Sequence, residues 1–181
     1  MPASMDKSDR GIIRNGTEKD LDDFFELYWI SSLEHAQYNE KLDALKSKEQ
    51  CKEYIVNRQR EFLKGKDEFF FVAEDNNKII GMITGHVAKR DEAEIYVIER
   101  VGYIDELCVS PEYRNSGIGK KLMEKLLEEL FKKDVEFVGL GAAYKNVAIN
   151  FYKSCGFIPE SVWMVREKNH KETKSDESKS S

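Results

Sequence analysis

The 181-residue sequence predicts an α+β fold with a mixed, mostly antiparallel central sheet flanked by helices. Two apolar strands, predicted at 69–73 and 79–87, are joined by a polar turn and therefore form an antiparallel hairpin. Downstream, a strand at 101–109, a helix at 117–133 and a strand at 135–140 form a β-α-β unit, whose two strands run parallel. An antiparallel front followed by a β-α-β unit gives a mixed sheet.

The first third of the chain predicts one short strand and two helices. Residues 11–14 form the strand. Thr17 suits a helix N-cap because acidic residues follow it, and apolar residues then recur at helical spacing from 18 to about 36. A second helix is predicted over 48–64.

The last third carries the strongest helical pattern. Apolar side chains recur at steps of three and four along 117–133, with Lys and Glu between them. Asn146 is expected to cap a shorter helix that ends at Cys155, with Gly156 as the left-handed residue after it. Residues 157–166 are predicted to close the fold as one or two strands.

Composition indicates one domain. A hydrophobic content of 40% suffices for a core, and no stretch approaches the ~20 apolar residues of a membrane span. Residues 1–10 are polar, lack a secretory signal, and are expected to be a flexible leader. Residues 167–181 contain no large apolar side chain and are expected to be a disordered polar tail. The domain is therefore predicted to span 11–166.

Charge and cysteine usage exclude several classes of function. The net charge of −5 argues against nucleic-acid binding and slightly favours a cationic small partner. The three cysteines form no CxxC pair, and the three histidines are scattered, so neither a disulfide scaffold nor a metal site is expected. A reducing cytoplasm is the expected location.

A glycine-containing loop opens the helix at 117–133, directly after a strand. Backbone N–H groups at a helix start attract anions, and glycine lets the anion approach closely, so the segment predicts a phosphate or pyrophosphate site. A P-loop is excluded because Lys121 stands where Ser or Thr is required, and a dinucleotide fingerprint because Leu122 replaces its third glycine. The expected site residues are Arg114, Asn115, Ser116, Gly117, Ile118, Gly119 and Lys120.

Two segments resemble one known family. Residues 109–119 read VSPEYRNSGIG and are similar to the acetyl-CoA-binding segment of the GNAT superfamily of N-acetyltransferases, R/Q-x-x-G-x-G/A. Residues 148–157 read AINFYKSCGF and resemble the A-I-x-F/L-Y-x-x-x-G-F block of the same family. The resemblance at residue level covers about 103–157. One departure is that Lys145 occupies the position, seven residues before Tyr152, where relatives often carry Asn.

The resemblance implies acetyl transfer from acetyl-CoA to an amine, without a metal. The pyrophosphate would lie on the backbone N–H groups of about 115–120. The pantetheine arm would pair with the backbone at Leu107 and Val109, beside Cys108, with the Leu107 N–H meeting the thioester oxygen. Asn146 and Lys153 complete the expected cofactor-binding residues.

An alkylamine with a pKa near 10 must lose a proton before it can attack, which a nearby carboxylate can accept. Asp105 and Glu106 precede the cofactor-binding strand end, and strand alternation predicts that they point to opposite faces. Both are candidates, and Glu106 is slightly favoured for its reach. Tyr152 matches the family's tyrosine acid, which protonates the departing thiolate. Cys108 has no histidine partner nearby in sequence and is expected to be a packing residue.

The sequence leaves the acceptor open. His35 and Tyr38 are expected to line the amine pocket, and a small cationic amine is slightly favoured. The alternatives are a protein or peptide acceptor, acetylated at its N-terminus or a lysine, and a non-catalytic CoA-binding module. The resemblance also allows a homodimer.

Overall fold

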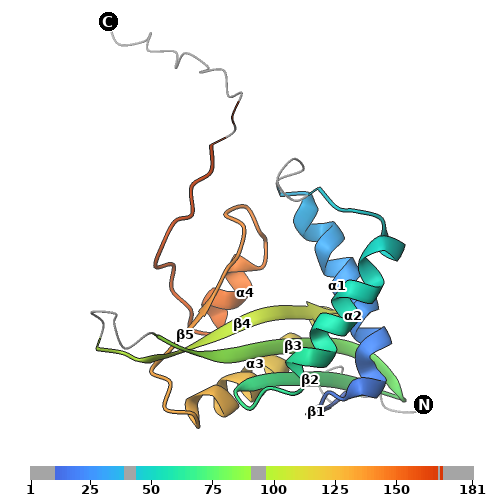
Figure 1. The fold of residues 1–181 in the computed structure, drawn as a ribbon, viewed down its shortest axis with the longest axis horizontal. Helices are drawn as coiled ribbons and strands as arrows, with labels where there is room; N and C mark the ends of the chain where they lie inside the picture. Colours follow the sequence, from blue (N-terminus) through green and yellow to red (C-terminus); the bar gives the residue numbers. More distant parts are fainter. Residues whose placement is uncertain (1–10, 39–43, 91–96, 167, 169–181) are drawn as a thin grey trace, which may run out of the picture.

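The computed structural model describes residues 11–38, 44–90, 97–166 and 168. Its centre is a five-stranded sheet in the order β1-β2-β3-β4-β5 (Figure 1). Adjacent strands run antiparallel except β4 and β5, which run parallel, so the predicted mixed sheet is confirmed. The strands are β1 (Ile12–Asn15), β2 (Glu68–Asp75), β3 (Lys78–Lys89), β4 (Arg100–Val109) and β5 (Phe137–Leu140). The predicted leader and nearly all of the predicted tail lie outside the described residues.

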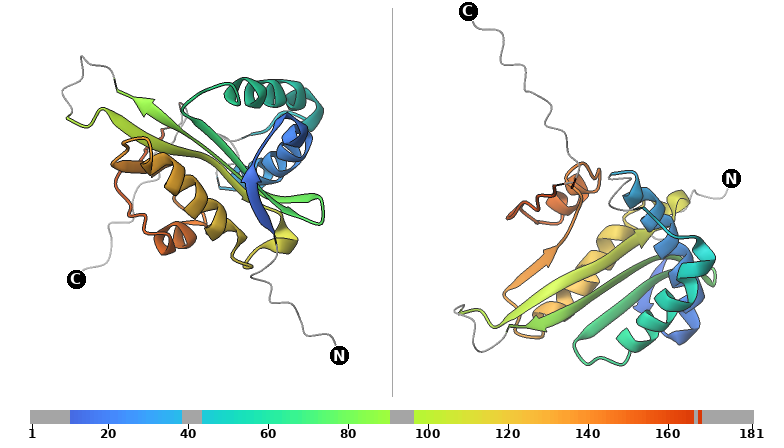
Figure 2. Two further views of the ribbon diagram at one scale, coloured as in Figure 1. Left: turned by 90° about the horizontal axis from the view of Figure 1, so that it is seen from below. Right: turned by 45° about the horizontal axis from the view of Figure 1, so that its top comes forward.

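Helices cover both faces of the sheet. Helices α1 (Leu21–Ala36) and α2 (Lys48–Phe62) lie on one face, while α3 (Ile118–Phe131) and α4 (Ile149–Ser154) lie on the other (Figure 2). Short 3₁₀ turns, η2 (Glu18–Asp20) and η3 (Pro111–Tyr113), precede α1 and α3. Each predicted helix is confirmed to within a few residues. No helix in the described ranges has the length and apolarity that crossing a membrane requires.

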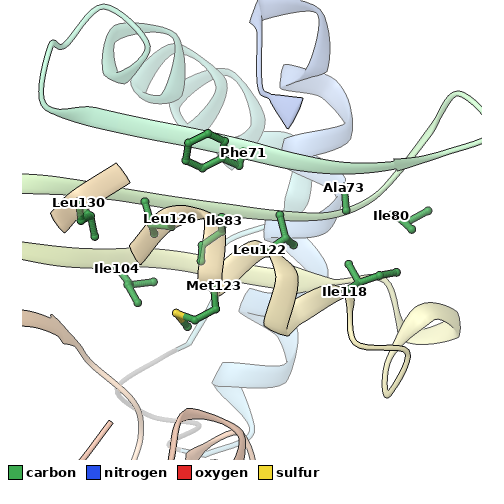
Figure 3. Close-up of a cluster of buried hydrophobic side chains, with 10 residues drawn as sticks. All are labelled: Phe71, Ala73, Ile80, Ile83, Ile104, Ile118, Leu122, Met123, Leu126 and Leu130. Carbon is green, nitrogen blue, oxygen red and sulfur yellow. The ribbon is translucent and has the colours of Figure 1, made fainter. Parts of the chain in front are cut away.

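The spacing of apolar residues on α3 explains its place against the sheet. Ile118, Leu122, Met123, Leu126 and Leu130 are at most 1% exposed and pack on the inner side chains of β2, β3 and β4 (Figure 3). On the opposite face, a second buried cluster joins α1 and α2 to the same strands. On β2 the two clusters use alternate residues, Phe71 and Ala73 in one and Phe70 and Val72 in the other, as expected for a strand buried on both faces.

The prediction of a strand within 157–166 is wrong. These residues form no strand, and the exposed fractions of Val162, Trp163 and Met164 are 79–86%. Figure 1 shows this segment leading away from the body after α4. A strand requires a neighbour to satisfy its N–H and C=O groups. The segment does not pair with the outer edge of β5, which no described strand covers, and Pro159 has no N–H to donate to such a pairing. Gly156 does adopt the expected left-handed conformation, with φ of 90°.

Two irregularities of β4 shape the site. Its pairing with β3 jumps from Thr84↔Glu106 to Gly85↔Ile104, so Asp105 is the extra residue of a β-bulge. Its pairing with β5 extends only from Val101 to Ile104. Beyond Ile104, β4 and β5 therefore diverge, and one edge of β4 has no strand beside it within the described residues.

Candidate active site

The bulge changes which side chains of β4 share a face. Ile104 packs in the cluster under α3, whereas Cys108 packs in the cluster under α1. Strict alternation would put both on one face, so the prediction that Asp105 and Glu106 point to opposite faces is wrong. With one extra residue in the strand, both carboxylates lie on the α1 and α2 face.

The unpaired edge of β4 presents backbone groups outward. The N–H of Ser110, just after β4, donates to the carbonyl oxygen of Ile80 in β3 at 2.9 Å. Because backbone groups of successive strand residues alternate in direction, the N–H and C=O of Leu107 and Val109 face away from β3. The carbonyl of Val109 accepts a bond from Arg114 Nε at 3.1 Å. This edge can pair with an extended ligand at Leu107.

The predicted glycine loop forms an open turn at the start of α3. Asn115 and Gly117 have φ angles of 58° and 84°, which turn the chain sharply into the helix. A Cβ built on Gly117 would meet no atom within 4 Å, so the space in front of the first helical turn is open. Ser116 donates its hydroxyl to Tyr113 O and braces the turn. Open space beside the first backbone N–H groups of a 14-residue helix fits a pyrophosphate.

The cationic side chains of this loop differ in their surroundings. Arg114 is held by Glu34 of α1 at 2.8 Å, in addition to its bond to Val109 O. Lys120 is 62% exposed, with its Nζ 3.8 Å from Glu124, so it is available at the rim. Lys153 lies exposed on α4. Ile118 differs from its neighbours in the loop because its side chain is buried in the core under α3.

A cavity of about 260 Å³ lies between the second half of α1 and β4. It is lined by Tyr28, Ser31, Ser32, His35, Ala44, Leu45 and Glu106. Among the described residues of this lining, Glu106 is the only carboxylate, and it places an acidic group against whatever occupies the cavity. His35 lies where it was expected, but Tyr38 does not belong to the lining.

Glu106 has the character of a base poised near neutral pH. The pKa of its carboxyl is raised to about 7, chiefly by burial; the charge of Arg58 on α2 opposes this shift, and the charge of Asp105 adds to it. A carboxylate of this pKa is largely ionised just above neutrality and binds a proton more strongly than an exposed glutamate.

Tyr152 reaches the same region from α4. It packs beside Phe151 and Phe157 on the α3 face of the sheet, with ring centroids 5.5 and 6.3 Å away. Burial raises the pKa of its hydroxyl, and Glu106 and Cys155 add to that shift. A phenol with a raised pKa holds its proton until a strong base, such as a thiolate, is produced.

Asn146 connects the loop before α4 to the C-terminal end of α1. Its Oδ1 accepts a bond from the N–H of Ala148 at 2.8 Å and one from Tyr38 Oη at 3.4 Å. Its Nδ2 lies 3.4 Å from His35 Nε2. The loop before α4 is thereby tied to the end of α1, and Tyr38 contributes to this contact. The N-cap of α4 is Ala148, so the prediction that Asn146 caps this helix is wrong.

Cys108 lies under α1 and away from the open edge. Its Sγ donates to Leu27 O at 3.1 Å, and burial raises the pKa of the thiol to about 12. A thiol of that pKa is not a nucleophile at neutral pH, which agrees with its expected packing role.

Several residues of the site were not found by sequence reasoning. Tyr28, Ser31 and Ser32 line the cavity, and His86 lies beside Asp105. The helical spacing that placed Tyr28 on α1 carried no sign of a cavity, because the opposing wall comes from β4. Among the described residues, no three His, Cys, Asp or Glu side chains are grouped as a metal site.

The comparisons with known proteins agree with this geometry. Residues 21–157 match the model of the acetyltransferase (GNAT) family. An uncharacterized N-acetyltransferase of Methanocaldococcus jannaschii is 32% identical over 157 residues, covering 83% of this chain and 62% of the relative, so the chain spans less than two thirds of that protein. N-alpha-acetyltransferase 30 of Schizosaccharomyces pombe is 30% identical over 122 residues, covering 67% of this chain and 78% of the relative.

A solved structure shares the fold. A predicted acetyltransferase from Clostridium acetobutylicum, crystallised with acetyl-CoA, aligns with a TM-score of 0.69 at 17% identity, covering 87% of this chain and 96% of the other. The family match spans both the glycine loop and the segment that carries Tyr152, and it includes the strand with the two carboxylates. The chain belongs to the GNAT family of acetyltransferases, and it is an acyltransferase of that type.

Proposed function

We propose that this enzyme transfers an acetyl group from acetyl-CoA to a primary amine by direct attack, with both substrates bound together. The observation that carries the proposal is the position of Glu106, which lines the cavity between α1 and β4 and comes from the strand whose free edge faces the cofactor side. Acetyl-CoA, when bound, supplies an acetyl thioester. The open turn at Gly117 and the outward backbone of Leu107 and Val109 are suited to hold it.

Each residue has one role in this proposal. Glu106 accepts the proton of the incoming ammonium, directly or through water, because its carboxylate is desolvated and lines the acceptor cavity. The Leu107 N–H donates to the oxygen on which negative charge develops. Tyr152 donates its hydroxyl proton to the departing sulfur. No covalent step on the enzyme is needed, because the only cysteine on β4 is Cys108, which is buried under α1.

Sequence and structure support a small cationic amine as the first acceptor to test. The cavity of about 260 Å³ has room for a small molecule, and Glu106 in its lining attracts a positive charge. A second candidate is a peptide N-terminus, favoured by the 30% identity to N-alpha-acetyltransferase 30. The free thiols of Cys51, Cys108 and Cys155 suit a reducing cytoplasm.

Amine-dependent release of CoA thiol from acetyl-CoA tests the proposal. The purified protein is assayed against polyamines, single amino acids, an aminoglycoside and short peptides with free or blocked N-termini. Release with free amines supports a small-molecule enzyme, whereas release only with unblocked peptides supports the second candidate. Saturable acetyl-CoA binding without transfer to any amine would contradict both and favour a non-catalytic module. Size-exclusion chromatography of the same sample tests the allowed homodimer.

A further inference from the structure

A polar cluster beside the acceptor cavity has no part in the mechanism proposed above. It comprises Glu68, His86, Tyr103 and Asp105 from three adjacent strands. Glu68 of β2 is the register partner of His86 of β3, which in turn is the partner of Tyr103 of β4. Residues paired in this way lie side by side on one face of the sheet, here the face that carries α1 and α2.

His86 is held in one orientation by two contacts. Its Nδ1 lies 2.9 Å from Asp105 Oδ2, and its ring stacks on Tyr103 with centroids 5.3 Å apart and planes 22° apart. A stacked ring with one nitrogen on a carboxylate keeps that nitrogen directed at the same acceptor. Asp105 therefore has a polar partner, whereas no side chain of the described residues forms a hydrogen bond or ion pair with Glu106.

The bulge makes this contact relevant to the reaction. It puts Asp105 and Glu106 on one face, where two like charges oppose each other's ionisation. The two carboxylates differ in their surroundings. The side chain of Asp105 is 34% exposed and lies outside the cavity lining, whereas that of Glu106 is desolvated and lines the cavity.

We propose that His86 is a positioning residue for acetyl transfer. It holds Asp105 outside the cavity and, through the contact of its ring nitrogen with the carboxylate, partly offsets the negative charge that Asp105 presents to Glu106. This arrangement assigns the base role to Glu106. The inference rests on the proposed function, because it assumes that an amine proton is removed beside Glu106.

The charged and titratable groups around this pair come from several elements. Those facing Glu106 or His86 are Tyr28 and His35 of α1, Arg58 of α2, Glu68 of β2, Tyr103 and Asp105 of β4, and Tyr152 of α4. Arg58 favours the ionised Glu106, and Asp105 opposes it. Burial raises the pKa of Glu68, and Asp105 raises it further, whereas His86 lowers it.

The sign of the effect follows from Coulomb's law. The ring nitrogen of His86 on the Asp105 carboxylate partly offsets the charge of Asp105, so Glu106 ionises more easily and the acid limb of the rate lies at lower pH. An apolar side chain at position 86 leaves that charge without this partner. Removing the charge of Asp105 itself shifts the ionisation of Glu106 to lower pH for the same reason.

The test compares the pH dependence of kcat/KM in three variants with that of the wild type. Asp105→Asn is expected to move the midpoint of the acid limb about 0.5–1 pH unit lower, with a plateau kcat reduced by less than tenfold. His86→Phe, which keeps a ring to stack on Tyr103 but offers no polar contact to Asp105, is expected to move the midpoint higher. Glu136→Gln is the matched charge control, because Glu136 is exposed before β5 and absent from the cavity lining, and it should leave the midpoint in place. The titration of the amine substrate is the same for the wild type and the three variants, so it cancels when their midpoints are compared.

A second readout does not depend on activity. Carboxyl ¹³C NMR of the unliganded protein follows the Glu106 titration in the same variants, with Glu106→Gln to assign the signal. Opposite shifts in Asp105→Asn and His86→Phe support the inference. Unmoved midpoints in both variants would overturn it, as would a hundredfold loss of plateau kcat in Asp105→Asn, which would make Asp105 the base. A wild type that transfers no acetyl group refutes the proposed function instead, while the NMR midpoints still decide whether the pair acts on Glu106.

Discussion

Glu106 and Tyr152 approach the open edge of β4 from its two faces. Glu106 lies on the α1 side, and Tyr152 packs on the α3 side. An acyl transfer with a proton acceptor on one side of the reacting carbon and a proton donor on the other needs this separation. Both groups also have raised pKa values from burial, which suits one to accept a proton and the other to keep it.

Tyr152→Phe tests the proton donor. Because the substitution removes only the hydroxyl, packing beside Phe151 and Phe157 is retained and stability should change little. We expect kcat to fall by about 10²-fold or more, while the dissociation constant for acetyl-CoA stays within about twofold. Pre-steady-state thiol release and calorimetric titration of acetyl-CoA measure the two quantities. An unchanged kcat would remove Tyr152 from the mechanism.

Glu106→Gln tests how the ionisation of Glu106 affects the stability of the folded protein. The folded-state pKa of about 7 lies above the ordinary 4.5, so the folded state binds the proton more tightly than the unfolded chain. The stabilising effect of that proton is complete below about pH 4.5 and is lost as pH rises through 7. At ~1.4 kcal/mol per pKa unit, the rise from 4.5 to about 7 means that ionised Glu106 costs about 3–4 kcal/mol.

The Gln variant is therefore expected to gain Tm relative to the wild type at pH 8 and not at pH 5. Differential scanning calorimetry at both pH values measures the difference. A gain of equal size at the two pH values would trace the effect to packing and not to charge.

At the scale of elements, the start of α3 is built to admit an anion. Glycine at position 119 is not required by the packing, because an added Cβ would lie 3.5 Å from the Phe151 ring and 3.7 Å from Val109. Those are ordinary contact distances. Glycine inside a helix costs about 1 kcal/mol relative to alanine, so a functional reason for Gly119 is expected.

Gly119→Ala should separate stability from binding. We expect the free energy of unfolding to rise by about 0.5–1 kcal/mol, because alanine favours the helix. The affinity for acetyl-CoA should fall at least tenfold, because a Cβ narrows the approach to the first helical N–H groups. Denaturant unfolding and equilibrium binding test the two effects. Gly117→Ala is the comparison, since its φ of 84° makes that substitution strained and destabilising.

The bulge in β4 depends on a glycine in the opposite strand. A Cβ on Gly85 would lie 2.5 Å from Tyr103 O and 2.8 Å from Leu126. The added Cβ would therefore clash with the backbone of β4 and with a core side chain of α3. Gly85→Ala is expected to destabilise the protein by about 1–3 kcal/mol and to shift the carboxylates of β4.

Thermal unfolding measures the stability of this variant, and the acid limb of its pH–rate profile measures the position of the carboxylates. Ala88→Gly, in the same strand and beyond the bulge, controls for a general weakening of β3. A Gly85→Ala protein with wild-type stability would show that the strands can separate without cost.

At the scale of the whole molecule, one ion-pair network joins the first strand to the rest of the fold. Arg14 of β1 binds Asp20 of η2 at 2.7 Å and Glu74 of β2 at 2.6 Å. The side chain of Asp20 is only 8% exposed and also accepts bonds from Thr17. The hydrogen bond from Arg14 is the main cause of a lowered Asp20 pKa, about 2 instead of 3.8.

This network predicts an acid-sensitive contribution to stability. Since the folded-state pKa of Asp20 is lowered, its stabilisation is complete above about pH 4 and is lost as pH falls towards 2. The contribution is about 2 kcal/mol at neutral pH. Asp20→Asn should lose about that amount at pH 7 and show a shallower decline of stability between pH 4 and 2. Chemical denaturation across this pH range measures both, and an unchanged slope would assign the acid sensitivity to other carboxylates.

Local sequence patterns determined the helices, the hairpin, the glycine loop at 114–120 and the two segments that carry the family resemblance. Each of these depends on residues a few positions apart, such as the three- and four-residue steps of α3 or the turn before Gly117. The tertiary structure decided what depends on distant residues meeting. The bulge at Asp105 needs Gly85 of another strand, and the cavity needs α1 against Glu106. The pairing of His86 with Asp105 needs β3 beside β4. The segment 157–166 has apolar residues suited to a strand, yet it forms none, because hydrogen bonds between strands require a neighbour that no local pattern supplies.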